Sequence, residues 1–495
     1  MTTARQNHQS PVCLSRITAL AAVVVLTMSP GRCWAADKPP NVVLVMTDNH
    51  GAWTLGCYGN RDVRTPHIDR LAAEGMLFTR AFSSNAVCSP TRATFLTGLL
   101  PSQHGVHCFL RRKEAQMGEN PYCTIGEFRT LPKVLSESGY RCGLVGKWHL
   151  GANMTPQEGF DYWITMPHGA TSTFYNAEVI EDGRLRSEPK YLTDLWTEHA
   201  VTFLKESRDK PFFLFLSYNG PYGLGGSLVR PARNRHAEFY ADKHLPSFPR
   251  TNMHPWLFNN KKFLNNDAAI RRFAAELSAV DDGVGTVMQT IEQLGLDENT
   301  IVVFCADQGW VGGQNGLWGM GDHTRPLTAF DGMMRIPLIV RHTSRISADS
   351  TSERMVSNYD LMPTLLSYLG LSKSDRLNAP SPGRDFSALL EGRETDWMDV
   401  VYYEMENVRA IRTDRAKYVH RHPSGPFELY DLESDPHEKI NLYGQPSQAG
   451  LQEDLEAQLH AFFDKHADPK YDLYRGGTSK ARLLSDPTVG PPRPK

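Results

Sequence analysis

The sequence predicts a doubly wound α/β fold, with a mostly parallel sheet flanked by helices and a small C-terminal antiparallel sheet subdomain packed with a helix. The first observation is a set of short continuous apolar runs, which are typical of parallel strands covered on both faces. These runs span 41–46, 141–145, 212–218, 300–305 and 336–340. The second is that helical patterns alternate with the runs, as this kind of sheet requires. The third is a change to short alternating runs after about residue 375.

Local signals place the other elements. Thr65 is suited to the cap and Pro66 to the first turn of a helix that Gly75 ends. A longer helical pattern covers 267–294, and the stretch 377–394 is rich in proline, glycine and charge, which is typical of a linker. Beyond it we expect four short strands and a helix, over 400–404, 408–412, 417–420, 429–432 and 451–463.

The N-terminal stretch has the layout of a secretory signal peptide. Arg5 and Arg16 precede an apolar run over 17–28 that is too short to span a bilayer comfortably, and the small Ala35 follows the helix-breaking Pro30. A membrane anchor is the alternative interpretation. With cleavage after Ala35, we expect an exported protein, periplasmic or extracellular, without a stable membrane span.

The same signals divide the chain into four parts. We expect the signal peptide over 1–35, the main α/β domain over 39–375, the antiparallel subdomain over 395–470 and a loosely ordered, proline-containing tail over 476–495. Nothing in the sequence fixes the oligomeric state.

Composition excludes two classes of protein. The chain has 495 residues, of which 40% are hydrophobic and 22% charged, and this is not the composition of a disordered chain. Its net charge of −2 provides no basic excess to neutralise phosphates, so we expect no nucleic-acid partner.

Two of the eight cysteines lie in the predicted signal peptide, and in an exported protein the other six can form disulfides. Cys108 and Cys123 bracket a loop and are the best predicted pair. Cys142 and Cys305 lie in strand-like apolar runs, where we expect buried free thiols.

Polar residues after two strand-like runs, together with one cysteine motif, predict a functional site. Asp48-Asn49 and Asp307-Gln308 follow such runs, and ligands of doubly wound sheets bind beyond the carboxyl ends of the strands. Cys88 begins a Cys-Ser-Pro-Thr-Arg stretch that reads as a loop running into a short helix, whose positive end suits an anion. A structural cysteine and solvated loop acids are the alternative interpretation.

The Cys-x-Pro-x-Arg motif with a downstream Thr-Gly resembles the signature of the formylglycine-dependent sulfatases, an arylsulfatase-like family of the alkaline phosphatase superfamily. Further stretches resemble other motifs of this family in the same order, namely 40–48, 146–151, 307–309, 335–339 and 428–442. The resemblance covers about residues 39–443 and implies an alkaline-phosphatase-like fold.

The resemblance also implies a role for each matching residue. A formylglycine-generating or sulfatase-maturating enzyme would oxidise Cys88 to formylglycine, whose hydrate is the nucleophile. Arg92 and Lys147 would hold the hydrate and the sulfate oxygens, and His149 would be the base. One divalent ion, Ca²⁺ in this family, would be held by Asp48, Asn49, Asp307, Gln308 and the modified Cys88.

Three positions depart from the family pattern. The family commonly has a histidine where this chain has Tyr222, and a phenol is a poor proton carrier near neutral pH. A lysine often stands where this chain has Met320, and we expect His323, three residues further on, to substitute for it. Asn49 replaces a carboxylate, which should weaken or re-tune metal binding without removing the site. We therefore expect an altered substrate preference or a substrate with a better leaving group rather than an inactive protein.

The predicted function is hydrolysis of an organic sulfate ester, with a sulfated carbohydrate as the expected substrate. Two alternatives accompany it. One is a phosphatase or phosphonate monoester hydrolase of the same superfamily, and the other is a catalytically silent relative that binds sulfated glycans.

Overall fold

The computed structural model describes residues 38–372, 377–378 and 380–485. The predicted signal peptide over 1–35 lies outside the described residues, and so does the end of the predicted tail. Within the described residues, no helix is long and apolar enough to cross a membrane.

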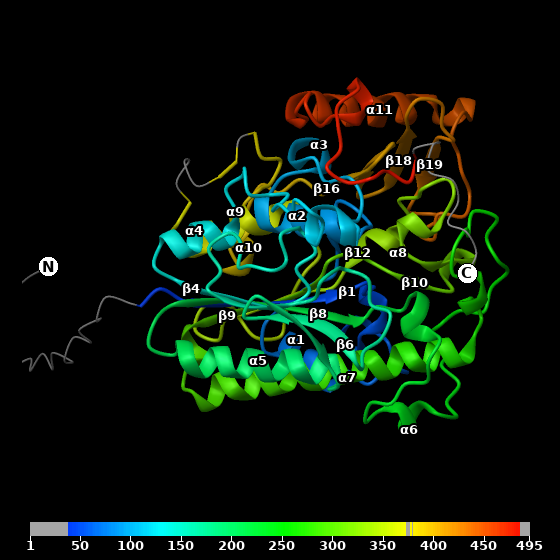
Figure 1. Ribbon diagram of the computed structural model, residues 1–495. Coiled ribbons are helices and arrows are strands. Elements are labelled where there is room, and N and C mark those ends of the chain that lie inside the picture. The colour runs from blue at the N-terminus through cyan, green and yellow to red at the C-terminus, as the bar shows by residue number, and fades with distance from the viewer. Residues whose placement is uncertain (1–37, 373–376, 379, 486–495) are drawn as a thin grey trace, which may run out of the picture. The chain divides into compact units, whose positions relative to one another are not determined.

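A ten-stranded sheet forms the centre of the fold, in the order β14-β2-β13-β9-β1-β8-β4-β5-β6-β7 (Figure 1). The strands from β9 to β5 are parallel, β13 is antiparallel to both of its neighbours, and β6 and β7 extend the sheet as an antiparallel pair. The predicted α/β fold with a mostly parallel sheet is therefore confirmed. The bounds are Asn41–Asp48 (β1), Met76–Phe78 (β2), Arg141–Gly146 (β4), Tyr162–Thr165 (β5), Ala177–Glu181 (β6), Arg184–Glu188 (β7), Phe212–Pro221 (β8), Thr300–Ala306 (β9), Leu338–Arg341 (β13) and Ser350–Ser352 (β14).

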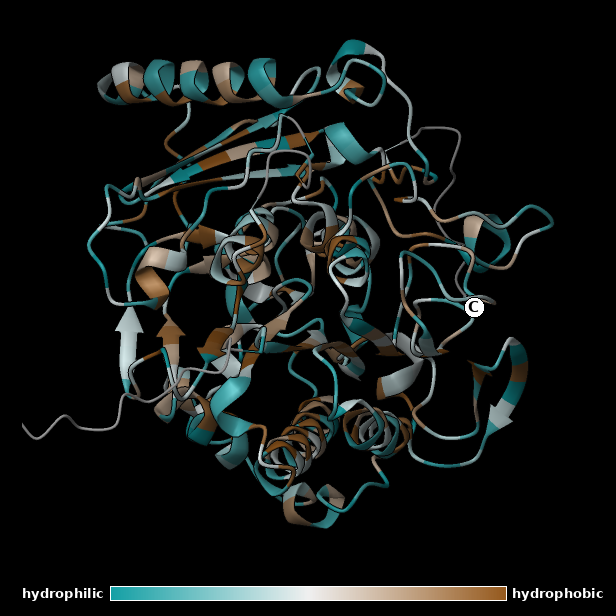
Figure 2. Cartoon of the chain, turned by 90° about the vertical axis from the view of Figure 1, so that its left-hand side faces the viewer, coloured by the Kyte–Doolittle hydropathy of each residue, from teal (hydrophilic) through white to brown (hydrophobic). Residues whose placement is uncertain are grey.

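Helices cover both faces of this sheet, because alternate side chains of the buried strands need an apolar layer on each side. Val43 and Val45 of β1 pack in the layer of α1, α5 and α7, whereas Val42 and Leu44 pack in the layer of α2, α4 and α9. Figure 1 shows the two helical layers on opposite sides of the sheet, and Figure 2 shows hydrophobic residues on the strands and on the helix faces turned toward them. The bounds are Pro66–Ala73 (α1), Cys88–Thr97 (α2), Leu131–Glu137 (α4), Leu192–Ser207 (α5), Asp267–Gln293 (α7) and Leu361–Tyr368 (α9).

The N-terminus of α1 is capped by a residue that local sequence does not indicate. Thr65 stands at the cap position, but its hydroxyl donates to Asp69. The free backbone N–H groups of His67 and Ile68 donate instead to the carboxylate of Asp281 on α7, at 3.2 and 2.7 Å. This capping contact ties α1 to α7, since a buried carboxylate needs such donors.

A four-stranded antiparallel sheet in chain order carries the last helix, as predicted. Its strands are β16 (Val400–Met405), β17 (Val408–Thr413), β18 (Ala416–Arg421) and β19 (Glu428–Asp431), and the helix is α11 (Ala449–His466). Leu455, Leu459 and Phe463 of α11 are buried against Ile411 and Tyr418 of the sheet. Figure 1 shows α11 lying across these strands.

Buried contacts join the small sheet to the main body. The Glu404 carboxylate accepts a 2.7 Å hydrogen bond from the Ser102 N–H and pairs with Arg409 at 2.8 Å. The stretch expected to be a linker contributes Phe386 and Leu390 to the core beside the large sheet, so it is packed rather than free. The remaining short elements are α3 (Pro101–His104), α6 (Ala237–Tyr240), α8 (Asp331–Met334), α10 (Ser387–Leu390), β3 (Ala81–Phe82), β10 (Val311–Gly312), β11 (Trp318–Gly319), β12 (Arg335–Ile336) and β15 (Val356–Ser357).

All six cysteines of the described residues are free thiols, so the predicted pairing of Cys108 with Cys123 is wrong. The two side chains lie in different environments: Cys108 is buried in a small apolar cluster, whereas the Cys123 thiol donates to Glu158 at 3.6 Å. Cys142 and Cys305 are buried free thiols, as expected.

Candidate active site

The carboxyl ends of β1 and β9 bring together the four oxygen-bearing residues that the sequence predicts as metal ligands. Asp48 ends the first strand and Asn49 follows it, and Asp307 and Gln308 follow the second strand. The Asn49 N–H donates to Asp307 Oδ1 at 3.1 Å, and the Gln308 amide donates to Asn49 Oδ1. All four side chains are fully buried. Adjacent parallel strands therefore produce this cluster, as their shared edge requires.

Cys88 contacts the same cluster from a helix, because it is the first residue of α2. Its thiol donates to Asp48 Oδ1 at 3.3 Å and accepts from Gln308 Nε2 at 3.2 Å. Burial, together with the charge of Asp48, raises the pKa of the Cys88 thiol well above its usual value. The Asp48, Cys88 and Asp307 ligand atoms all lie within 4.8 Å of one another.

The cluster has the donors and the charge that a divalent cation requires. Burial and the neighbouring Asp307 raise the pKa of Asp48 to about 7, as happens when two carboxylates share a dry site. Gln308 Oε1 is buried and has no hydrogen-bond partner among the described residues. A cation at this point would relieve both features, because hard oxygen ligands suit calcium and magnesium. The residues present therefore fit a divalent ion.

Two buried cations lie beneath this cluster. Arg92 donates to Asp307 Oδ2 from Nε at 3.0 Å and from Nη2 at 2.8 Å, and its Nη1 bonds Ser217 Oγ and the Lys147 carbonyl. Lys147 Nζ donates to Asp48 Oδ2 at 2.6 Å. Both side chains are fully buried. The two basic residues that the sequence predicts for the sulfate thus each pair with a carboxylate of the cluster.

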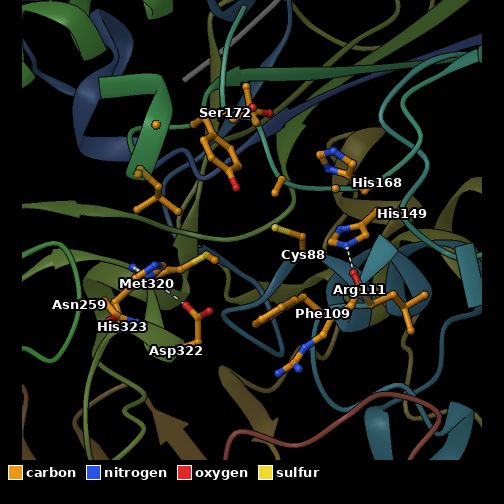
Figure 3. Close-up of a pocket in the computed structure, with 18 of the residues that line it drawn as sticks. Cys88, Phe109, Arg111, His149, His168, Ser172, Asn259, Met320, Asp322 and His323 are labelled. Atoms are coloured by element: carbon orange, nitrogen blue, oxygen red, sulfur yellow. Dashed lines mark hydrogen bonds and ion pairs between the residues drawn. The ribbon is translucent and has the colours of Figure 1, made fainter. Parts of the chain in front are cut away.

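A cavity of about 630 Å³ opens above the cluster and is lined by Cys88, His149, Tyr222, Met320 and His323 (Figure 3). Four of the six residues predicted as catalytic therefore reach it directly. Arg92 and Lys147 are not among the described residues that line it.

The hydrogen bonding of His149 defines a neutral tautomer whose Nδ1 can accept a proton. Its Nε2 lies 2.9 Å from the Leu110 carbonyl, to which it must donate, so Nδ1 carries the free electron pair. Nδ1 is buried and has no hydrogen-bond partner among the described residues. Burial, with the nearby Lys147, lowers the pKa of His149 well below its usual value, which keeps the imidazole neutral.

Two hydrogen bonds of its main chain hold Tyr222 at the cavity wall. Its N–H donates to the Asp48 carbonyl at 3.1 Å, and its carbonyl accepts from Asn49 Nδ2 at 3.0 Å. Its φ of 61° is uncommon for an aromatic residue and is sustained by these bonds. Burial raises the pKa of Tyr222 well above its usual value, so the phenol stays a hydrogen-bond donor.

Met320 and His323 form the opposite wall. The Met320 sulfur accepts from Gln308 Nε2 at 3.3 Å, so it packs on the metal-ligand cluster instead of supplying a charge. His323 Nδ1 lies 2.8 Å from Asp322 Oδ1, and Figure 3 shows the pair facing Cys88 across the cavity.

Sequence reasoning missed several residues of the site. Asp322 directly precedes His323 in the sequence, and this adjacency indicates that the two side chains are close. Ser217 ends a predicted strand but carries no motif that reveals its bond to Arg92. Gly169 was not detectable: a Cβ at this position would lie 2.0 Å from His149 Nδ1, so only glycine leaves room for the ring.

A model of the sulfatase family matches residues 40–371, and a model described as N-sulphoglucosamine sulphohydrolase, C-terminal, matches residues 323–465. The first match covers more than half of the chain. The chain therefore belongs to the sulfatase family and is a sulfuric ester hydrolase.

Individual relatives agree with this assignment. The N-acetylglucosamine-6-O-sulfatase of Bacteroides thetaiotaomicron is 26% identical over 512 residues, covering 87% of each chain. An ulvan-active sulfatase of Formosa agariphila is 30% identical over 452 residues, covering 86% of this chain and 81% of that one. A solved structure of a sulfatase from Bacteroides fragilis, described as putative, has a TM-score of 0.74 and 28% identity, covering 88% of this chain and 98% of the other.

The buried pair between Arg92 and Asp307 yields a prediction for stability. In EDTA, Arg92→Met should lower the free energy of unfolding by about 3–5 kcal/mol, because it leaves a buried carboxylate without its cation. Ser217→Ala, which removes one hydrogen bond of the same arginine, should cost only about 1 kcal/mol. Urea unfolding followed by tryptophan fluorescence measures both. Equal losses in the two variants would contradict the proposed importance of the ion pair.

Proposed function

We propose that this sulfatase removes sulfate from a sulfated carbohydrate, using formylglycine formed from Cys88 and one divalent ion, Ca²⁺. The observation that carries the proposal is the position of Cys88: it lies at the start of a buried helix, at the bottom of the cavity, and against Asp48 and Gln308. A nucleophile formed there would meet both the substrate and the ion. Export and maturation by a formylglycine-generating or sulfatase-maturating enzyme are part of the same proposal.

The residues that would hold the ion are Asp48, Asn49, Asp307 and Gln308, which meet at the strand ends; the Gln308 amide directs Nε2 to Asn49 Oδ1 and would turn to present its oxygen to an ion. Asn49 contributes a neutral oxygen where a second carboxylate is common. When present, the hydrated formylglycine supplies two hydroxyls on one carbon, so that one can attack sulfur and the other can release the sulfate, while the ion polarises the ester.

The chain's own residues complete the nucleophile side of the site. His149 Nδ1 has a free electron pair and is assigned as the base for the hydroxyl proton. Lys147 donates to Asp48 Oδ2 beneath the cluster and would act by holding that carboxylate in place. Arg92 is fully engaged with Asp307 and its neighbours and would act by fixing that carboxylate.

On the leaving-group side, His323 is assigned as the proton donor to the departing alcohol, and its Nδ1 lies 2.8 Å from Asp322 Oδ1. Tyr222 offers a neutral hydroxyl that can donate to a sulfate or ester oxygen. These two residues would replace the histidine and lysine that the family commonly uses, and Met320 only packs.

A carbohydrate substrate is supported by the relatives and by the cavity wall. The relatives are named for N-acetylglucosamine-6-O-sulfate and ulvan. The cavity is lined by Phe109 and by polar side chains such as Asn259 and His168 on other sides of it, a combination that suits the apolar face and the hydroxyls of a sugar (Figure 3).

Arg111 indicates a second anionic group on that sugar. Its guanidinium lies at the cavity wall, 6.0 Å from the centre of the Phe109 ring, and forms no ion pair with a carboxylate of the described residues. The adjacent Arg112, by contrast, pairs with Glu178. An unpaired guanidinium at a ligand site matches a carboxylate or a further sulfate.

Modification of Cys88 is the first test. Protein produced with the maturation enzyme should contain a Cys88 peptide that has lost the mass of one sulfur and two hydrogens and gained one oxygen. Cleavage of nitrophenyl sulfate should rise with the modified fraction and exceed cleavage of nitrophenyl phosphate. Cys88→Ala should abolish turnover, since the nucleophile is gone, whereas Cys123→Ala, outside the cavity, should keep it. Full activity from unmodified Cys88 would refute the mechanism.

Removal of an assigned metal ligand is the second test. Asp307→Ala should lose the bound divalent ion and reduce turnover by at least about 100-fold. Even mutation of a residue that only hydrogen-bonds to a metal ligand lowers metal affinity by up to about 100-fold. Asp454→Ala, an exposed carboxylate on α11, serves as the control. Elemental analysis and nitrophenyl sulfate assays provide the readouts. Retention of a full equivalent of ion by Asp307→Ala would exclude this ligand set.

The Arg111 assignment makes a third prediction, about specificity. Arg111→Ala should raise KM about tenfold for a sugar that carries a second sulfate or a carboxylate, because one charge-assisted hydrogen bond is lost. KM for nitrophenyl sulfate should not change. Lys113→Ala, an exposed cation two residues further on, is the matched control. An equal effect of Arg111→Ala on both substrates would argue against the anionic subsite.

A further inference from the structure

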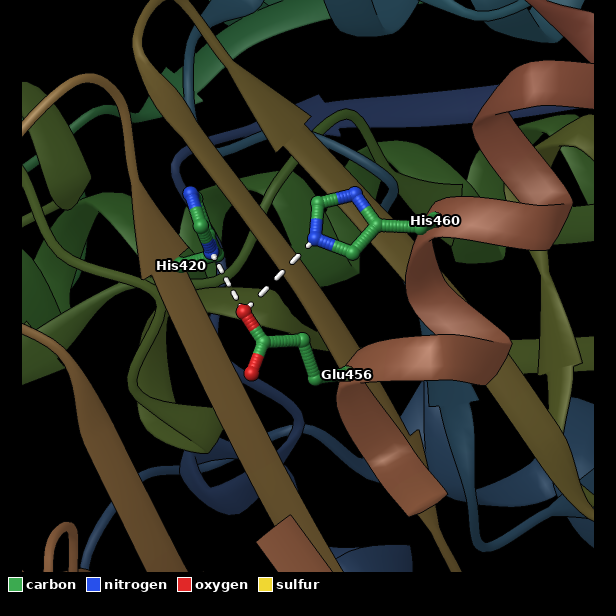
Figure 4. Close-up of side chains that lie close together, drawn as sticks. All are labelled: His420, Glu456 and His460. Atoms are coloured by element: carbon green, nitrogen blue, oxygen red, sulfur yellow. Dashed lines mark ion pairs between the residues drawn. The ribbon is translucent and has the colours of Figure 1, made fainter. Parts of the chain in front are cut away.

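A second group of converging side chains lies outside the active-site cavity, between the small sheet and the last helix. His420 lies on β18, and Glu456 and His460 lie one turn apart on α11 (Figure 4). His420 Nδ1 and His460 Nε2 are each 3.7 Å from Glu456 Oε1. The three candidate ligand atoms all lie within 4.8 Å of one another.

These distances suit a shared metal ion better than direct hydrogen bonds. A nitrogen–oxygen separation of 3.7 Å is too long for a hydrogen bond. Ligands bound tetrahedrally at about 2.1 Å from a zinc ion stand roughly 3.4 Å apart, so only a small adjustment is needed. Two imidazoles and one carboxylate form a ligand set that zinc prefers over calcium or magnesium.

We propose that His420, Glu456 and His460 bind one divalent transition-metal ion of the zinc class, with water as the fourth ligand. The ion would fasten α11 to the antiparallel sheet, because one ligand comes from the strand and two from the helix. This site is separate from the oxygen-rich cluster at Cys88, and the inference does not rest on the proposed function.

The ligands are held in position by the packing around them. Leu455 and Leu459 anchor α11 in the apolar cluster below, and they immediately precede Glu456 and His460 in sequence. Residues four apart on a helix face the same side. The His420 carbonyl accepts a 3.0 Å hydrogen bond from the Tyr474 hydroxyl, which fixes its strand. Little conformational freedom would be lost on binding.

The surroundings also supply a hydrogen-bonding group beside the candidate ligands. The Tyr418 hydroxyl lies 3.2 Å from His420 Nδ1 and also interacts with Glu456. When the nitrogen binds an ion, the phenol can donate to the carboxylate and orient it.

Titration of Zn²⁺ into the full-length protein by calorimetry, with excess Ca²⁺ to saturate the oxygen-rich cluster, tests the site. Wild type should bind one equivalent, and Zn²⁺ should raise its Tm. His460→Ala and Glu456→Gln should each weaken binding by at least about 100-fold and abolish the Tm increase, since loss of a direct ligand exceeds the effect of an outer-shell change. The His460 side chain is half exposed, so its removal should not impair folding.

Two controls locate the ion. His437→Ala, which removes an exposed histidine after β19, should bind Zn²⁺ like wild type. Asp307→Ala should also keep the equivalent, because its carboxylate belongs to the other cluster. Failure of wild type to bind Zn²⁺, or unchanged binding in both ligand variants, would overturn the proposal. Loss of the equivalent in Asp307→Ala alone would assign the ion to the active site and overturn it as well.

Discussion

Two fully buried ion pairs, between Asp48 and Lys147 at 2.6 Å and between Asp307 and Arg92 at 2.8 Å, are the interactions on which the rest of the site depends. Four charges taken out of water are tolerated only when each has its partner and its hydrogen bonds. Each pair bridges separate elements: β9 to α2, and β1 to the loop after β4. The position of Cys88 at the first turn of α2 follows from that constraint, because the helix cannot shift without unpairing Arg92.

The two sides of the cavity differ in how they use charge. On the Cys88 side, buried cations and carboxylates neutralise one another, and the neutral His149 ring offers a free electron pair at Nδ1. On the opposite side, Met320 and Tyr222 bring no charge, and His323 Nδ1 lies 2.8 Å from Asp322 Oδ1. The buried ion pairs of the site therefore lie on the Cys88 side of the cavity.

Chemistry and recognition are carried by different parts of the chain. The oxygen-rich cluster lies on strand ends and at a helix start, which are rigid because both faces of the sheet are covered. The cavity walls come from connecting segments far apart in sequence, including 109–112, 168–172, 224–226 and 259–260. Loops can vary without disturbing a buried sheet, so substrate preference can change while the cluster stays in place.

The sequence by itself determined β1, β4, β8, β9 and β13 of the large sheet, the long helix, the C-terminal sheet and the set of residues at the strand ends, because these depend on local periodicity and on short motifs. The tertiary structure decided which groups meet across long separations: the Asp281 cap on α1, the unpaired Cys108, the Asp322 contact with His323 and the alignment of β13. It also directed Arg92 to Asp307 instead of the cavity. Such contacts are set by distances between elements that pack together, and no local pattern along a chain encodes those distances.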